Sequence, residues 1–180
     1  TADITERTLT VTPDASQSKV YGATDPALTF AFGNEATGEI PAFTGALTRQ
    51  TGEAAATYEI LAGDLALADS AAGNFLAANY SLSFTTGETF EITKAPLTIT
   101  ADDTTKSQGV ALTFAGTEFT TQGLQSGDAV TSVTLTSAGT AVGAGVGTYP
   151  INPTNAQGTG LDNYTITYTD GTLTIEDDTA

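Results

Sequence analysis

Carboxylates are the residues of this sequence best suited to holding a ligand. Asp102 and Asp103 form one acidic pair, and Asp177 and Asp178 form another near the end of the chain. Calcium takes several oxygen ligands, which carboxylates and carbonyls supply. These four aspartates are therefore candidate calcium ligands at the boundaries of structural units. The alternative is that they are solvated strand-end residues that accept hydrogen bonds from nearby backbone amides.

The composition excludes most catalytic chemistry. The 180 residues contain neither His nor Cys, so a His-dependent triad, a cysteine nucleophile and a Cys/His zinc site are absent. There is also no glycine-rich phosphate loop with its lysine. Asp and Glu abound, but nothing singles out two of them as a pair for glycoside hydrolysis. We therefore expect a protein that is not an enzyme and that has no certain cofactor.

The charge balance limits the partners. There are 21 Asp and Glu residues against 5 Lys and Arg residues, which gives a net charge of −16. Such a surface repels the phosphates of nucleic acids and of anionic bilayers. No apolar run approaches the roughly 18 residues that a membrane-spanning helix needs. We expect no nucleic-acid binding, no membrane insertion and, through self-repulsion, a monomer in isolation.

Five segments of the first half recur in the same order in the second half. A lysine occupies the same place in both copies, at Lys19 and Lys106. Five matches in one order indicate a duplication. The matched segments are residues 9–12 with 97–100, 27–30 with 111–114, 57–60 with 148–151, 79–84 with 163–168, and 90–92 with 173–175.

The duplication divides the chain into two tandem domains, residues 1–93 and 94–180. Extra residues fall between the matched segments, as in the Ala-rich stretch 61–78, which places them on surface loops. The join from Ile92 to Pro96 contains no flexible Gly/Ser tract. Because a short, proline-bearing link restricts motion, we expect the two domains to form an elongated rod.

The matched segments alternate apolar and polar residues. Tyr80, Leu82 and Phe84 face one way, and the serines between them face the other. A period of two with many Thr, Val, Ile and Tyr residues predicts strands that have one buried face. About six to seven short strands per copy predict small all-β domains, either β-grasp-like or Ig-like sandwiches.

Local signals predict the connections between these strands. Asp170-Gly171 and Thr86-Gly87 lie between alternating runs and predict hairpins, because such turns need a positive φ. Residues 69–78 and 119–130 are the segments with enough helical character for one or two turns. The tyrosines that recur in register are predicted to be core or sheet-face residues: Tyr58, Tyr80, Tyr149 and Tyr164.

The lysines raise the question of an intramolecular isopeptide cross-link. Such a link needs a buried lysine beside an asparagine and an acid. Lys19 and Lys106 occupy matching polar positions, and Lys94 lies in the join. We therefore expect exposed lysines and no cross-link.

The first copy contains Tyr21-Gly22 followed by Asp25-Pro26, then the segment 45–49. With this pattern it resembles the MBG repeat of the YGX type along nearly its whole length. The second copy resembles it in part, because Gln108-Gly109 replaces the Tyr-Gly pair and the Asp-Pro pair is deleted. Gly22 is expected to have a positive φ, and Asp25-Pro26 to shape a turn before a strand.

The resemblance implies a mainly-β fold, an extracellular location on a bacterial cell surface, and no catalytic residues. It also implies a structural or spacer module of an adhesin that supports cell adhesion or biofilm formation, with adjacent repeats of the parent protein as partners. The alternative is an adhesive module whose loops, such as 61–78, recognise a glycan or a protein of the host or bacterial surface.

Overall fold

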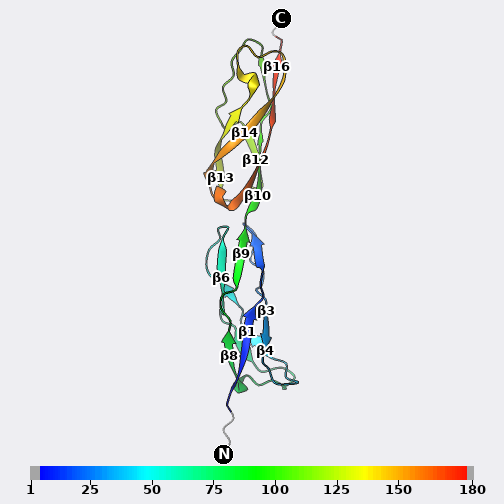
Figure 1. Cartoon of the computed structure of the whole chain (residues 1–180), viewed down its shortest axis with the longest axis vertical. Helices are drawn as coiled ribbons and strands as arrows, with labels where there is room; N and C mark the ends of the chain where they lie inside the picture. Colours follow the sequence, from blue (N-terminus) through cyan, green and yellow to red (C-terminus); the bar gives the residue numbers. More distant parts are fainter. Residues whose placement is uncertain (1–4, 178–180) are drawn as a thin grey trace, which may run out of the picture. The chain divides into compact units, whose positions relative to one another are not determined.

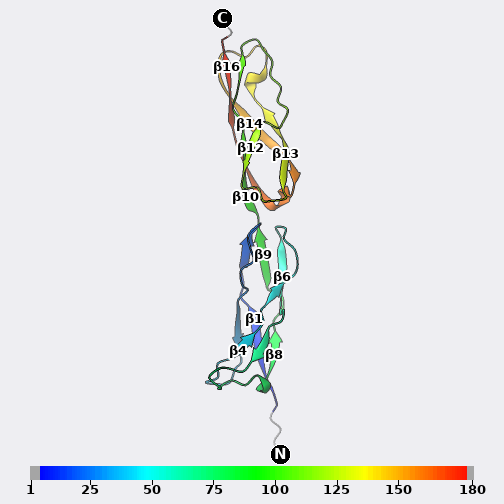
Figure 2. The same ribbon diagram turned by 180° about the vertical axis from the view of Figure 1, so that it is seen from behind.

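The computed structural model describes residues 5–177, which form two compact units (Figures 1 and 2). Unit 1 is Thr1–Thr93 and unit 2 is Lys94–Ala180. This boundary coincides with the one that the duplication predicts. Within the described residues, strands dominate and the helical segments are single 3-10 turns; none is long and apolar enough to span a membrane.

Unit 1 contains nine strands among its described residues, more than the six to seven that the sequence predicts. The Ala-rich stretch 61–78 accounts for part of the excess, because it forms a short strand that pairs with another short strand. The elements are β1 (Arg7–Pro13), β2 (Gln17–Val20), β3 (Phe30–Gly33), β4 (Ala42–Thr44), β5 (Thr48–Arg49), β6 (Thr57–Leu61), β7 (Ala66–Ala68), η1 (Ala77–Asn79), β8 (Tyr80–Phe84) and β9 (Thr89–Thr93).

Unit 2 contains seven strands among its described residues, as the sequence predicts. One of its two 3-10 turns, like the turn of unit 1, immediately precedes the strand that begins at the matched tyrosine. The elements are β10 (Ala95–Ala101), β11 (Thr104–Ser107), β12 (Phe119–Gln122), β13 (Ala129–Thr136), η2 (Ala138–Thr140), β14 (Gly147–Thr159), η3 (Leu161–Asn163), β15 (Tyr164–Thr169) and β16 (Gly171–Glu176).

Each unit closes its own apolar core. Along β16, Leu173 and Ile175 are buried while Thr172 and Glu176 are exposed, which is the alternation that the sequence predicts. Among residues 5–177, the buried clusters of the two units have no residue in common. Unit 1 buries Val11, Leu47, Ile60, Leu65, Phe90 and Ile92 in one cluster and Leu9, Phe75 and Tyr80 in another, and unit 2 buries Ala101, Ile151, Leu173 and Ile175. The prediction of two all-β domains is confirmed.

In each unit, the first two strands pair in parallel with the last two strands. We call these two pairings together the parallel spine. In unit 1, β1 pairs with β8 and β2 pairs with β9. Arg7 faces Tyr80 and Gln17 faces Phe90, so the register is the same on both sides of the bend between the strands. In unit 2, β10 pairs with β15 and β11 with β16, again in one register.

Other strands flank the spine in the same way in both units. The sheet orders are β3-β1-β8 and β2-β9-β6-β5 in unit 1, and β12-β10-β15 and β11-β16-β14-β13 in unit 2. The first strand is therefore central in one sheet and the last strand is central in the other. Immunoglobulin sandwiches consist of antiparallel sheets, so the parallel pairs distinguish these units from that topology.

The predicted hairpins are wrong. β15 and β16 do not pair with each other, because β15 joins β10 while β16 joins β11 and β14. Likewise β8 and β9 lie in different sheets. Gly171 is needed for close packing instead, since a Cβ there would lie 2.6 Å from the Ala101 carbonyl oxygen.

The prediction of helical turns is wrong for residues 119–130 and holds in small part for 69–78. The first segment contributes β12 and the start of β13, which pair with β10 and β14. The second segment contributes two residues to the 3-10 turn η1.

Candidate functional site

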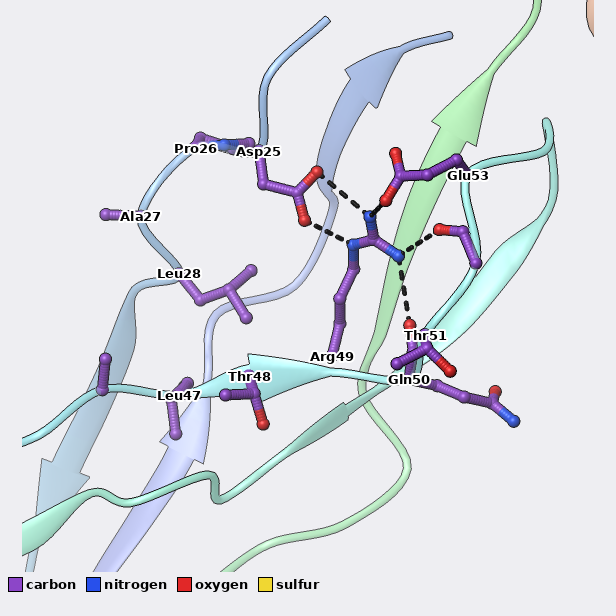
Figure 3. Close-up of a pocket in the computed structure, with 12 residues that line it drawn as sticks. Asp25, Pro26, Ala27, Leu28, Leu47, Thr48, Arg49, Gln50, Thr51 and Glu53 are labelled. Atoms are coloured by element: carbon purple, nitrogen blue, oxygen red, sulfur yellow. Dashed lines mark hydrogen bonds and ion pairs between the residues drawn. The ribbon is translucent and has the colours of Figure 1, made fainter. Parts of the chain in front are cut away.

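Four charged side chains of unit 1 form a compact group, the charge cluster: Lys19, Asp25, Arg49 and Glu53. Lys19 lies on β2. Arg49 projects from the end of β5, and Asp25 and Glu53 from the loops that follow β2 and β5 (Figure 3). The Lys19 Nζ lies 2.5 Å from Asp25 Oδ1 and also contacts Glu53. The two cationic side chains are 4% and 7% exposed, against 42% for Asp25 and 71% for Glu53.

Every N–H of the Arg49 guanidinium has a partner. Nε and Nη2 donate to the two carboxylate oxygens of Asp25, at 2.6 and 3.1 Å. Nη2 also donates to Glu53 Oε1 at 2.6 Å, and Nη1 donates to the carbonyls of Gln50 and Gly52 at 3.1 and 2.5 Å. A guanidinium has five donors, so Arg49 has none left for a ligand.

Aromatic rings hold the guanidinium from the core side. The Arg49 Cζ lies 5.1 Å from the centroid of the Tyr58 ring and 5.4 Å from that of Phe90. Both distances are in the range of cation–π attraction. Phe90 is fully buried and belongs to the unit 1 core, so Arg49 joins the core to the two loops.

The cluster keeps all four groups charged. Hydrogen bonds from Arg49, and then from Lys19, lower the pKa of Asp25 to about 2. The hydrogen bond from Lys19 is the largest factor that lowers the pKa of Glu53. Burial disfavours the charge of Lys19, but its bonds to Asp25 and Glu53 outweigh this and raise the pKa of Lys19. Two positive and two negative charges make the cluster neutral.

An open cavity of about 450 Å³ adjoins the cluster and is lined by residues 25–28 and 46–53. Its charged lining consists of Asp25, Arg49 and Glu53, and Arg49 binds both acids (Figure 3). The arrangement ties the loop after β2 to the loop after β5. Its chemistry is that of a structural ion-pair network.

Comparison with known proteins agrees with this picture. The sequence profile of the MBG domain (YGX type) matches the chain twice, over residues 9–91 and 97–174. The chain belongs to the MBG domain family of the YGX type. Among curated proteins, none matches the chain significantly. The chain is thus a tandem pair of MBG domains, which are repeat modules of surface proteins.

The YGX motif of the first MBG domain builds the charge cluster. The Tyr21 amide donates to the Thr93 carbonyl at 2.8 Å and extends the spine by one bond. Gly22 then has a φ of +82°, as predicted, and turns the chain away from the sheet. The reversal brings Asp25 back over Lys19. The sequence assigned the Asp-Pro pair to a turn and missed this second role of Asp25.

The second MBG domain keeps the turn and lacks the cluster. The Gln108 amide donates to the Glu176 carbonyl at 2.9 Å, and Gly109 has a φ of +81°. This domain contains no arginine. The Lys106 Nζ instead donates to the carbonyl oxygens of Val110 and Ala141, at 2.7 and 2.8 Å. Backbone carbonyls therefore replace the carboxylates of the first domain.

The prediction of exposed lysines is wrong for the two that match. Counted over the whole residue, backbone included, Lys19 and Lys106 are each 8% exposed. They lie on the core-facing side of β2 and β11 and have partners there. Burial does not make Lys19 a cross-linking residue. The cross-link also needs an asparagine beside the lysine, whereas Lys19 binds the acids Asp25 and Glu53.

The recurring tyrosines are confirmed as core or sheet-face residues. Tyr80 and Tyr164 are 7% and 3% exposed. Each hydroxyl donates to a carboxylate at 2.6 Å, to Glu39 in the first MBG domain and Asp128 in the second. The other two pack against the cores, and each donates to the carbonyl four residues earlier: Tyr58 to Ala54 and Tyr149 to Gly145.

The structure does not bring together the three candidate calcium ligands that it describes, Asp102, Asp103 and Asp177. Asp102 and Asp103 follow β10, and Asp103 Oδ1 accepts a 2.6 Å hydrogen bond from the Thr172 amide at the start of β16. Asp177 follows the end of β16, roughly 16 Å further along at the usual rise of a strand. Asp178 lies outside the described residues. Among residues 5–177, no group of three or more acidic side chains is arranged to hold a metal ion.

Calcium binding is therefore tested most directly through stability. A ligand that binds the native state raises the melting temperature by mass action. Because Asp103 already bonds a backbone amide and Asp177 lies far from it, we expect equal melting temperatures with calcium and with a chelator. Calorimetry of the full chain in both conditions measures this. A calcium-dependent rise that disappears in an Asp177→Asn variant would contradict the expectation.

Proposed function

We propose that this tandem pair of MBG domains is a non-catalytic structural spacer of an extracellular bacterial adhesin, which supports adhesion or biofilm formation at the cell surface. The parallel spine is the observation that supports it most. Arg7 and Thr93 lie at opposite ends of the spine of the first unit, so the chain enters at one end and leaves at the other. A repeat that is joined to neighbours on both sides needs this arrangement.

The chemistry of the surface also supports a spacer. The charge cluster is neutral and uses all donors of Arg49 internally. The net charge of −16 therefore comes from the rest of the chain. This excess of negative charge keeps neighbouring copies apart. The proposed partners are adjacent repeats of the parent protein, with no cofactor required.

Small-angle scattering of the full chain tests the spacer proposal. The short proline-bearing join predicts a monomeric, stiff, two-domain particle. Its radius of gyration is expected well above the roughly 16 Å of a compact globule of 180 residues. Insertion of a long Gly/Ser segment at Lys94, the matched control, is expected to broaden the distance distribution. A compact particle, or one as flexible as the control, would refute the spacer.

A second candidate function is a loop-mediated adhesive contact, and one observation favours it. The Asn74 side chain donates to the Gly38 carbonyl at 3.0 Å and joins two loops of unit 1. These loops expose Ile40 and Leu76, at 67% and 48%. Glycan arrays and cell-binding assays separate the candidates. Binding that is lost in an Ile40→Ser/Leu76→Ser variant supports adhesion, whereas no binding supports the spacer.

A further inference from the structure

We infer that the parallel spine of each unit is a mechanical clamp, which makes the domain resist stretching between its two ends far better than its size suggests. The function is to carry tension along the chain. It follows from how the first and last strands are paired, and it would stand even if the parent protein were not an adhesin.

The first supporting observation is the uninterrupted register of the spine. In unit 1, Thr8 faces Ser81 in β8 and Thr12 faces Thr85 beyond it, both at a separation of 73 residues. The pairs of β2 with β9 continue the same separation, from Gln17–Phe90 to Val20–Thr93. The two strand segments on each side of the bend therefore behave as one long parallel pair.

The same register holds in unit 2. Ala95 faces Tyr164 at one end, and Ser107 faces Glu176 at the other. The bond from the Thr172 amide to Asp103, at a separation of 69 residues, spans the bend. Two domains with different loops thus keep the same construction.

The second observation is the central position of the terminal strands. β1 lies between β3 and β8, and β9 lies between β2 and β6. In unit 2, β10 lies between β12 and β15, and β16 lies between β11 and β14. Each strand that receives the pull is therefore held on both sides, and neither is an edge strand that peels away.

The direction of the pull decides how the hydrogen bonds fail. Ladder hydrogen bonds run between neighbouring strands, across the strand direction. When the ends of a unit are pulled apart, the first strand slides along its parallel partner, and all bonds of the pair bear the load together. When two paired residues at the same end are pulled apart, the bonds break one after another.

Buried side chains add to the resistance against sliding. Leu97 and Ile99 of β10 and Leu173 and Ile175 of β16 are at most 1% exposed. Sliding by one residue would move each of these side chains to the opposite face of its sheet. The pull must therefore break the ladder and the core packing in the same event.

Single-molecule pulling through engineered cysteines tests the clamp. The chain contains no Cys, so each double variant has two unique handles. Lys94→Cys with Glu176→Cys pulls unit 2 along its spine. Ser107→Cys with Glu176→Cys pulls apart a facing pair of the same spine. All three positions are exposed, so both variants are expected to fold, which circular dichroism verifies.

The expected result is a rupture force severalfold higher for the Lys94/Glu176 variant than for the Ser107/Glu176 variant. Unit 1 provides an independent comparison if either variant is misfolded. There Glu6→Cys with Lys94→Cys pulls along the spine, and Val20→Cys with Lys94→Cys peels it open. Equal forces in the two directions, or a lower force along the spine, would overturn the inference and leave the spacer proposal untouched.

Discussion

Replacement of Ile60 by alanine is expected to destabilise unit 1 and leave unit 2 unchanged. Ile60 is fully buried in the core of unit 1. Truncation of a buried isoleucine to alanine removes apolar contacts and leaves a cavity, which costs about 2 to 5 kcal/mol. Amide hydrogen exchange of the full chain, read by peptide, is expected to show faster global opening in residues 9–93 alone.

The matched variant is Ile151→Ala, because Ile151 is the equivalent residue of unit 2 and is also fully buried. This variant is expected to give the opposite pattern, with faster hydrogen exchange in unit 2 and unchanged exchange in unit 1. Together the two variants test whether each repeat folds on its own core. Exchange that accelerates in both units with either variant would show that they unfold as one body, contrary to the two separate cores.

An Asp25→Asn variant is expected to lower the free energy of unfolding of unit 1 by about 1 to 3 kcal/mol. Loss of one partner of a buried ion pair costs about 3 to 5 kcal/mol, because it leaves an uncompensated charge. We expect less here, since Asp25 is 42% exposed, which screens its charge, and Glu53 still faces both cations. Asp14→Asn, at an exposed position of the same unit, is the matched control and is expected to have little effect.

The stabilisation that the Asp25 carboxylate gives to the folded state is expected to disappear in acid. The pKa of Asp25 is lowered from 3.8 to about 2 in the folded protein. A depressed pKa stabilises the folded state above the ordinary pKa, and that contribution is lost as the pH falls through the folded value. The difference in melting temperature between wild type and Asp25→Asn is therefore expected to be full at neutral pH and to shrink toward pH 2. A difference that is constant over this range would contradict the ion-pair explanation.

The strands were predictable because they depend on local pattern. The alternation around Tyr80 and Tyr164 specifies which side chains are buried whatever the partner strand. The partners were not predictable, because alternation carries no information on the direction of the neighbouring strand. Asp170-Gly171 has the sequence of a hairpin turn, yet β16 gains more by pairing on both sides, with β11 and β14, than by folding back on β15.

The charge cluster could be predicted from the sequence only in part. Its motif residues were visible in the sequence, and Lys19 recurs as Lys106. The sequence does not show that Arg49 binds Asp25, because the two residues are 24 positions apart in the chain. Lysine at a polar position of a strand indicates exposure on average. Here the side chain is buried, because acids or carbonyls from distant loops complete its bonds.

The two registers have a consequence for how such repeats diverge. The strands of the spine are 73 residues apart in unit 1 and 69 apart in unit 2, yet both spines have the same plan. The difference of four residues therefore lies in the segments between the spine strands, and each spine stays uninterrupted. Copies of this repeat can change the length of their loops while each domain keeps the same strands at its two ends.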